Sequence, residues 1–197
     1  MPSLSPDVAA ELDAAVLEYR HHDNVGVLLD AVGALAARAT PEALVSAAER
    51  YRDMPEVTIP VYERVVAAQP TNARALVVLA NAYWLTGRGP DVVGELATRA
   101  MAIDPENRGA WHLWALAEPD PRARTERWHQ VTQRFPADQL ARAALADNAA
   151  SLAGAEHDPI ALDLAIRSYE SLLAEAEAPP QRAALEGALK TLKGWKL

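Results

Sequence analysis

Residues 75–97 read ALVVLANAYWLTGRGPDVVGELA, and this stretch allows two incompatible structures. An apolar run leads into Gly87 and Gly89 and then into a helix-like segment, which is the order of strand, glycine turn and helix in a dinucleotide-binding site. The same letters also fit two helices joined by a tight turn. The choice separates a cofactor-dependent enzyme from a binding scaffold.

The glycine pattern departs from a phosphate-binding loop, because Gly94 lies two residues beyond the third glycine of the G-x-G-x-x-G spacing. Gly89 followed by Pro90 is typical of a turn in which proline opens the next helix. The stretch therefore predicts helices over 73–86 and 90–103, and no cofactor. The apolar positions that recur at helical spacing are Leu76, Leu79, Ala80 and Tyr83.

The composition predicts a helical protein with a buried core. Of the 197 residues, 50% are hydrophobic and 23% are charged, which gives the chain enough apolar material to fold. Glycine is scarce, and the dominant residue types favour helices over strands. Cysteine is absent, which excludes disulfides, thiolate zinc sites and a cysteine nucleophile.

The charge and the N-terminus indicate where the protein acts. A net charge of −8 argues against nucleic-acid binding, since an acidic surface repels phosphate. The first residues lack the pattern of a signal peptide. No apolar run reaches the roughly 18 residues needed to span a bilayer. We therefore expect a cytoplasmic protein that binds neither nucleic acid nor membrane.

Helical periodicity continues along the whole chain, interrupted by short turns, which predicts an all-α fold of about eleven helices. Ser5 followed by Pro6, and Thr40 followed by Pro41, are typical of a helix cap and a first helical position. The expected helices cover residues 5–20, 24–39, 41–52, 57–69, 73–86, 90–103, 107–117, 121–134, 138–153, 159–176 and 180–193.

An internal repeat appears when three prolines are set in register. In each repeat the proline ends one helix, an Asn or Asp caps the next, and a small alanine lets two helices approach closely while a large apolar residue fills the gap between them. The prolines are Pro70, Pro105 and Pro136; the caps are Asn72, Asn107 and Asp138; the large residues are Leu79, Trp114 and Leu145; the alanines are Ala80, Ala115 and Ala146.

These residues resemble the tetratricopeptide repeat (TPR). The Leu-x-x-Leu-Ala-x-x-Tyr pattern that ends at Tyr83, and Trp111-x-x-Trp114-Ala115 in the next repeat, match the packing positions of that family. The resemblance implies a TPR-like α-α superhelix of antiparallel helix pairs. It divides the chain into irregular N-terminal helices over 1–57, which form a degenerate repeat or cap, TPR-like repeats over 58–178, and a C-terminal capping helix over 179–197.

The chain also departs from a regular array after residue 118. The repeat after Pro105 is about three residues short, because Glu118-Pro119-Asp120-Pro121 closes its first helix early. The stretch from Pro136 to Pro179 is too long for one repeat. We therefore expect irregular geometry in this part of the chain.

Three polar clusters are candidate sites of chemistry. His21-His22-Asp23 fits a polar helix end better than a metal site. His112 and His129 each adjoin a tryptophan, but no Ser or Cys nucleophile motif accompanies them, so a structural or partner-contacting role is expected. The arginines at 122, 124, 127 and 134 fit a solvated helix face, with the docking of an acidic peptide as the alternative.

The resemblance implies a concave groove, lined by the first helix of each repeat, that binds an extended peptide or a partner's helix. Asn81 occupies the place where many peptide-binding repeats hydrogen-bond the ligand backbone. Val77 stands where carboxylate-gripping repeats carry a lysine, so an apolar or basic partner segment is expected. The groove residues are Val77, Asn81 and Trp84, then His112 with Leu116, then Ala143 with Asp147.

The leading hypothesis is a non-enzymatic scaffold that binds a partner protein in this groove. One alternative is self-association through the groove or the terminal helix, in which the segment LKGWKL inserts Trp195 into a neighbouring copy. Another is an accessory subunit or small helical enzyme whose site lies in residues 1–57, and a closed, polar, histidine-lined pocket near residues 20–25 would favour it.

Overall fold

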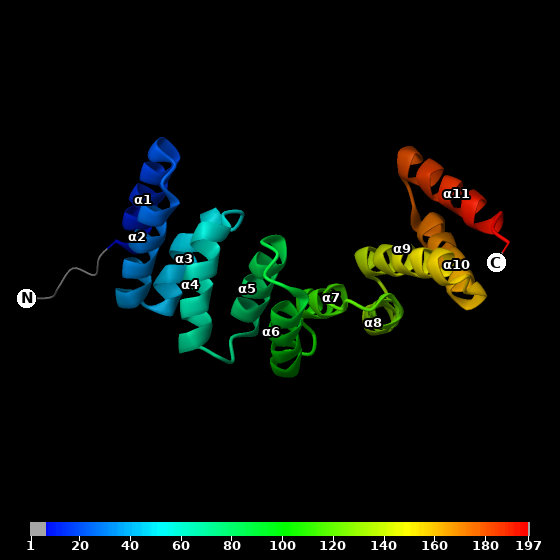
Figure 1. Ribbon diagram of the computed structural model, residues 1–197, viewed down its shortest axis with the longest axis horizontal. Helices are drawn as coiled ribbons and strands as arrows, with labels where there is room; N and C mark the ends of the chain where they lie inside the picture. Colours follow the sequence, from blue (N-terminus) through cyan, green and yellow to red (C-terminus); the bar gives the residue numbers. More distant parts are fainter. Residues whose placement is uncertain (1–6, 197) are drawn as a thin grey trace, which may run out of the picture. The chain divides into compact units, whose positions relative to one another are not determined.

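The computed structural model describes residues 7–196. Its contacts divide the chain into two compact units, Met1–Ala110 and Trp111–Leu197. The described residues form eleven α-helices and no strand, which confirms the predicted all-α fold (Figure 1). None of these helices is long and apolar enough to cross a membrane.

The first unit is built from successive helix pairs joined by short turns (Figure 1). Helices α1 and α2, α3 and α4, and α5 and α6 pack as partners, and α4 also packs on α2 and α5. A short 3₁₀ turn, Glu49–Tyr51, follows α3. The helices are α1 (Val8–His22), α2 (Val25–Arg38), α3 (Pro41–Ala48), α4 (Pro55–Ala68), α5 (Ala73–Leu85) and α6 (Pro90–Ile103).

Helix α7 spans the boundary between the units, and the second unit continues with four longer helices. Helix α9 packs on both α8 and α10, and α10 packs on α11. The bounds are α7 (Arg108–Leu116), α8 (Pro121–Arg134), α9 (Gln139–Glu156), α10 (Pro159–Glu175) and α11 (Pro179–Lys193).

Most helix starts follow the predicted capping chemistry. Thr40 caps α3 by accepting a hydrogen bond from the backbone N–H of Ala43, with Pro41 at the first helical position. Asp7 caps α1 in the same way, whereas the predicted cap at Ser5 and the first position at Pro6 lie outside the described residues. The two glycines of the opening stretch have positive φ, +70° at Gly87 and +100° at Gly89, which permits the tight turn between α5 and α6.

Three turns of the chain repeat one set of hydrogen bonds, at the prolines that set the repeat register. In each, the residue before the proline donates its N–H to the carbonyl four residues earlier. The capping residue donates its N–H to the carbonyl three residues earlier, and its side chain accepts from the N–H three residues later. The four residues joined are Val65, Gln69, Asn72 and Ala75; Ala100, Asp104, Asn107 and Ala110; and Val131, Phe135, Asp138 and Ala141.

The packing positions of the opening stretch are inside the fold. Leu76 and Leu79 of α5 are buried, and each contributes about 1.5–3 kcal/mol by burial of its side chain. The alanines of the repeat, Ala80, Ala115 and Ala146, are each 0% exposed, as expected at positions where two helices approach closely. These residues confirm the helical interpretation of residues 75–97.

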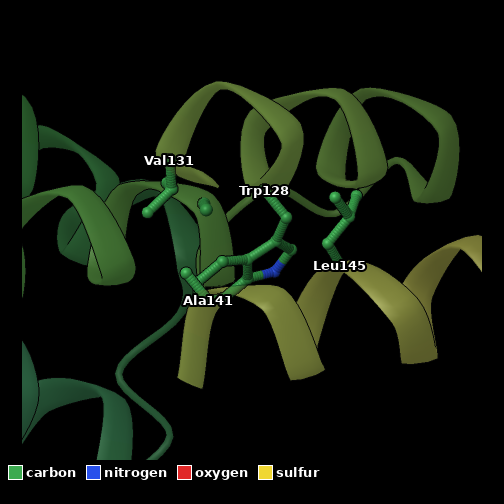
Figure 2. Packing of buried hydrophobic residues seen from close by; sticks show 5 residues of the cluster. Trp128, Val131, Ala141 and Leu145 are labelled. Carbon is green, nitrogen blue, oxygen red and sulfur yellow. The ribbon is translucent and has the colours of Figure 1, made fainter. Parts of the chain in front are cut away.

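Trp128 of α8 is the largest side chain of one buried core cluster in the second unit. Its indole points from α8 onto α9, between Ala141 and Leu145 (Figure 2). Trp111 and Trp114 are partly buried against the same cluster and meet edge to face, with ring centroids 5.7 Å apart. The prediction that these two tryptophans pack between helices is therefore confirmed.

Helix α7 ends early, as the short repeat predicts, and arginines of α8 donate to carbonyls at its end and just beyond it. Arg127 donates to the carbonyl of Trp114 at 2.8 Å, and Arg124 donates to the carbonyl of Glu118 at 3.0 Å. Arg124 and Arg127 are half-buried, so the predicted solvated face of arginines is wrong at these two positions. The physical reason is that Pro119, which follows Glu118, has no backbone N–H to donate. The carbonyls left without a backbone donor at the end of α7 therefore take their donors from arginine side chains.

The excess length after Pro136 is taken up inside the last repeat. Helices α9 and α10 have 18 and 17 residues, whereas α5 and α6 have 13 and 14. The predicted boundary between residues 57 and 58 falls inside α4, while the boundary before residue 179 coincides with the start of α11. The three-part division of the chain stays a prediction.

Candidate functional site

One candidate binding surface lies on α5 in the first unit. Helical spacing places Val77, Asn81, Trp84 and Leu85 on one side of this helix, and we call these four residues the α5 strip. The Asn81 side chain is exposed and forms no hydrogen bond with the described residues. Trp84 is 37% exposed and Leu85 is 68% exposed. The strip therefore presents an unpaired amide beside an indole and a leucine.

Val77 lies at the edge of the α5 strip and is half-buried. Its Cγ1 atom would be 3.2 Å from a Cβ atom placed on Gly109, so glycine at that position lets the start of α7 approach α5 closely. Val77 is therefore partly covered by its own chain.

Tyr83 holds the α5 strip in place from the opposite side of the helix. Its hydroxyl donates to Oε1 of Glu63 on α4 at 2.6 Å, and the Arg88 guanidinium lies 5.0 Å from its ring centroid. Burial, followed by the contact with Glu63, raises the pKa of Tyr83 to about 12. The tyrosine thus stays neutral and fixes α5 to α4.

A second candidate surface lies on α9 in the second unit. Ala143, Asp147, Ala150 and Ser151 share one face of this helix, and we call them the α9 strip. Asp147 is exposed, and its Oδ1 atom accepts a hydrogen bond from the hydroxyl of Tyr169 on α10. Burial, followed by this contact, raises the pKa of Tyr169. The carboxylate is therefore held in a fixed orientation.

The α9 strip leads into a shallow, open cleft of about 320 Å³, which we call the C-terminal cleft. Its lining comes from α9, α10, α11 and the residues that follow α11, and is mostly apolar or small. The lining residues are Ala150, Ser151, Tyr169, Ala188, Thr191, Leu192 and Trp195.

Trp195 forms one wall of the C-terminal cleft by packing on a glycine of its own chain. A Cβ atom on Gly154 would be 3.2 Å from Cη2 of the indole. Glycine inside a helix costs roughly 0.5–1 kcal/mol relative to alanine, so its presence in α9 has a use here: it leaves room for the ring. Trp195 is still 36% exposed, which leaves part of the ring available to a ligand.

His112 and Leu116, the predicted groove residues of α7, are engaged in packing. The Nε2 atom of His112 lies 2.6 Å from Oδ2 of Asp138, and its ring meets Trp128 with centroids 5.4 Å apart. Leu116 is half-buried against the cluster around Trp128. Their contact with a partner stays a prediction.

The structure thus places three of the predicted groove residues in the first unit and four in the second. Within each unit it adds residues that were not among the predicted groove residues: Leu85, one helical turn from Asn81, and Tyr169, whose hydroxyl binds Asp147. Trp195 lines the C-terminal cleft together with Tyr169. Trp195 and the glycine on which it packs both lie just beyond predicted helices, Gly154 after the helix expected over 138–153 and Trp195 after the one expected over 180–193, and the observed α9 extends past Gly154.

A polar hollow of about 270 Å³ lies where α1 meets α2. Its lining residues are Glu18, Tyr19, His22, Asn24 and Val27, and all except Tyr19 are exposed. Its lining side chains are mostly exposed and include a single histidine, so it is not the closed, histidine-lined pocket that the enzyme alternative requires. The structure therefore does not favour the enzyme alternative at this place.

The remaining histidines show no shared site. His21 donates from Nδ1 to the carbonyl of Leu17 at 2.8 Å, which confirms a polar helix end. His129 lies near Glu126, with Nδ1 and Oε2 4.0 Å apart. Among the described residues no three metal-ligating side chains come together.

Comparison with known proteins supports the fold. No protein-family model matches the sequence, and no curated protein matches it. Several solved structures do. MamA matches with a TM-score of 0.60 and 14% identity over 88% of this chain and 98% of that one. The thermophilic TPR protein TTC0263 of Thermus thermophilus matches with a TM-score of 0.55 and 18% identity over 94% and 98%.

A third match is PilF of Pseudomonas aeruginosa, with a TM-score of 0.54 and 16% identity over 96% of this chain and 93% of that one. At these identities the similarity concerns the fold alone. The chain therefore has a fold of the TPR type, an all-α arrangement of the α-α superhelix class, as the repeat pattern predicts.

Proposed function

We propose that this protein is a non-enzymatic scaffold that binds a segment of a partner protein on the exposed faces of its repeat helices. The observation that carries the proposal is the α5 strip, where the unpaired amide of Asn81 adjoins the exposed indole of Trp84. An amide of this kind can pair with the backbone of an extended peptide, which offers one donor and one acceptor per residue.

Trp84 supplies the apolar part of this contact. An exposed tryptophan can bury apolar surface against a partner while losing little side-chain freedom. Tryptophans are also enriched among the residues that dominate interface energies. Leu85, 68% exposed, extends the apolar area along the helix. The three side chains together suit a partner segment with apolar side chains.

The partner is expected to be apolar or basic. The net charge of −8 favours cationic segments and disfavours nucleic acid. Val77 offers no charge to a terminal carboxylate. We place the protein in the cytoplasm, with no membrane partner and no cofactor, and we expect any self-association to appear in light scattering as a mass that rises with concentration.

The test is capture of partners by a double variant. Asn81→Ala combined with Trp84→Ala should lose the proteins that the intact chain captures from lysate, identified by mass spectrometry. Loss of one interface tryptophan commonly costs about 2 kcal/mol, which is roughly thirtyfold in affinity. Val92→Ala on α6, where the side chain is 43% exposed, is the matched control. If the double variant captures the same partner proteins as the intact chain, the proposal is wrong.

A further inference from the structure

The C-terminal cleft has the size and chemistry for one large apolar side chain. Its volume of about 320 Å³ lies at the lower end of the range for ligand pockets, about 300–1,000 Å³. Leu192 and the exposed part of the Trp195 indole provide apolar surface, and Ala150 and Ala188 keep the space between α9 and α11 open. A leucine or an aromatic side chain fits within this space.

A fixed negative charge stands one helical turn from the cleft. Asp147 precedes Ser151 by four residues on the same face of α9, which corresponds to about 6 Å along the helix. No Lys or Arg among the described residues forms an ion pair with Asp147. The Tyr169 hydroxyl binds only one of its carboxylate oxygens. The other oxygen is available to a cation from outside the chain.

We propose that the α9 strip and the C-terminal cleft bind an extended peptide segment in which a large apolar residue and a Lys or Arg stand two positions apart. The apolar side chain enters the cleft beside Trp195, and the cation pairs with Asp147. The inference rests on the proposed function, because it names the partner chemistry of a second binding face.

The spacing of the two side chains follows from backbone geometry. Residues two apart in an extended peptide lie on the same side and about 6.6 Å from each other. That separation is close to the rise of about 6 Å along α9 from Asp147 to Ser151, at the near edge of the cleft. Adjacent residues would point to opposite sides, so two positions is the shortest spacing that turns both side chains toward α9. The charge on Asp147 also selects against an acidic segment.

The experiment uses the full chain and blocked synthetic peptides with one Leu and one Arg two positions apart, in either order. The five tryptophans give five indole N–H signals in an NMR spectrum, and Trp195→Phe identifies the signal of Trp195. One of the two peptides should shift that signal and leave the Trp84 signal in place. Replacing its Leu by Ala, or its Arg by Glu, should weaken binding on the order of tenfold.

A charge swap at Asp147 provides the sharper test. Asp147→Lys should invert the preference, so that the peptide with Glu binds more tightly than the peptide with Arg. Asp163→Lys is the matched control, because this exposed carboxylate lies on α10 and outside the cleft lining. Asp147→Asn keeps an acceptor for Tyr169 and should lower the affinity for the Arg peptide several-fold.

The outcomes separate this inference from the proposed function. If no peptide shifts the Trp195 signal, or if Asp147→Lys leaves the preference unchanged, the inference is overturned, whereas capture through Asn81 and Trp84 can still stand. A shift of Trp84 alone would place the peptide on the α5 strip and overturn it as well. A Trp195 signal that moves with protein concentration, without peptide, would identify a second copy as the occupant and likewise overturn it.

Discussion

His112 of α7 and Asp138, the cap of α9, are joined through Nε2 and Oδ2 at 2.6 Å. The other carboxylate oxygen of Asp138 accepts from the backbone N–H groups of Leu140 and Ala141. The same aspartate is 5% exposed. One buried carboxylate therefore starts α9 and holds the imidazole of α7, so the repeat cap also joins two helices of the second unit.

Asp138→Ala should destabilise the second unit more than an ordinary cap deletion does. The change removes a helix cap, worth about 1 kcal/mol, and leaves the half-buried His112 without its carboxylate, which brings the total to roughly 2–3 kcal/mol. Urea unfolding measures this loss. Asp163→Ala serves as the control, and an equal effect of the two changes would contradict the double role of Asp138.

Tyr62 and Tyr83 should respond differently to loss of their hydroxyls. The Tyr62 side chain is 1% exposed and its hydroxyl has no hydrogen-bond partner among the described residues, so Tyr62→Phe should be neutral or stabilise the protein by up to about 1 kcal/mol. Tyr83→Phe loses the bond to Glu63 and should cost about 0.5–1.5 kcal/mol. Thermal unfolding of the two variants compares them directly. A larger loss of stability in Tyr62→Phe than in Tyr83→Phe would contradict this prediction.

Asp158 should make stability depend on pH in the acid range. Hydrogen bonding to the backbone N–H of Ala161, and then the bond from Arg122, lower the pKa of Asp158 below its usual value of 3.8. A carboxyl group whose pKa is lower in the folded state stabilises that state above its unfolded pKa. This contribution is lost as pH falls below about 4 and through the folded pKa.

Asp158→Asn should therefore flatten the acid limb of the stability curve while keeping a side-chain oxygen for the cap. Circular dichroism during acid titration measures this change. The control is Asp163→Asn, which removes an exposed pair with Arg167 on the same helix. If Asp158→Asn unfolds in acid as the intact protein does, Asp158 does not contribute to the pH dependence of stability.

Two glycines inside helices should give opposite results when replaced by alanine. Gly187 of α11 has nothing within 4 Å of the position that an added methyl group would take, so Gly187→Ala should stabilise the protein by about 0.5–1 kcal/mol. Gly154→Ala places its methyl group against the Trp195 indole, so the gain should be smaller and the ring should become more exposed. Urea unfolding and the emission wavelength of tryptophan check the pair; equal gains would mean that Gly154 does not seat Trp195.

Much of the fold could be predicted because the repeat is local chemistry. Pro70, Pro105 and Pro136 end helices, and the Asn or Asp two residues later caps the next helix through its own backbone neighbours. Such bonds span only a few residues, so a register of prolines and caps in the sequence predicts them directly. The burial of Leu76 and Ala80 follows from the same helical spacing.

The arginines of α8 show where local chemistry was insufficient. Their spacing indicated a solvated face, because a sequence does not reveal which carbonyls lack donors. Arg127 instead stacks on Trp114, 4.6 Å from the ring centroid, and pairs with Glu118 at 2.5 Å. These contacts depend on how α7 ends against α8.

By itself, then, the sequence determined the helices, their caps and the repeat, since each rests on side chains within about one turn of one another. It also placed Asn81 and Asp147 on helix faces that do not carry the core. Tertiary structure alone decided that Trp195 packs on Gly154 and that Tyr169 binds Asp147. Those contacts join residues of different helices, and the chain brings them together only when the helices pack.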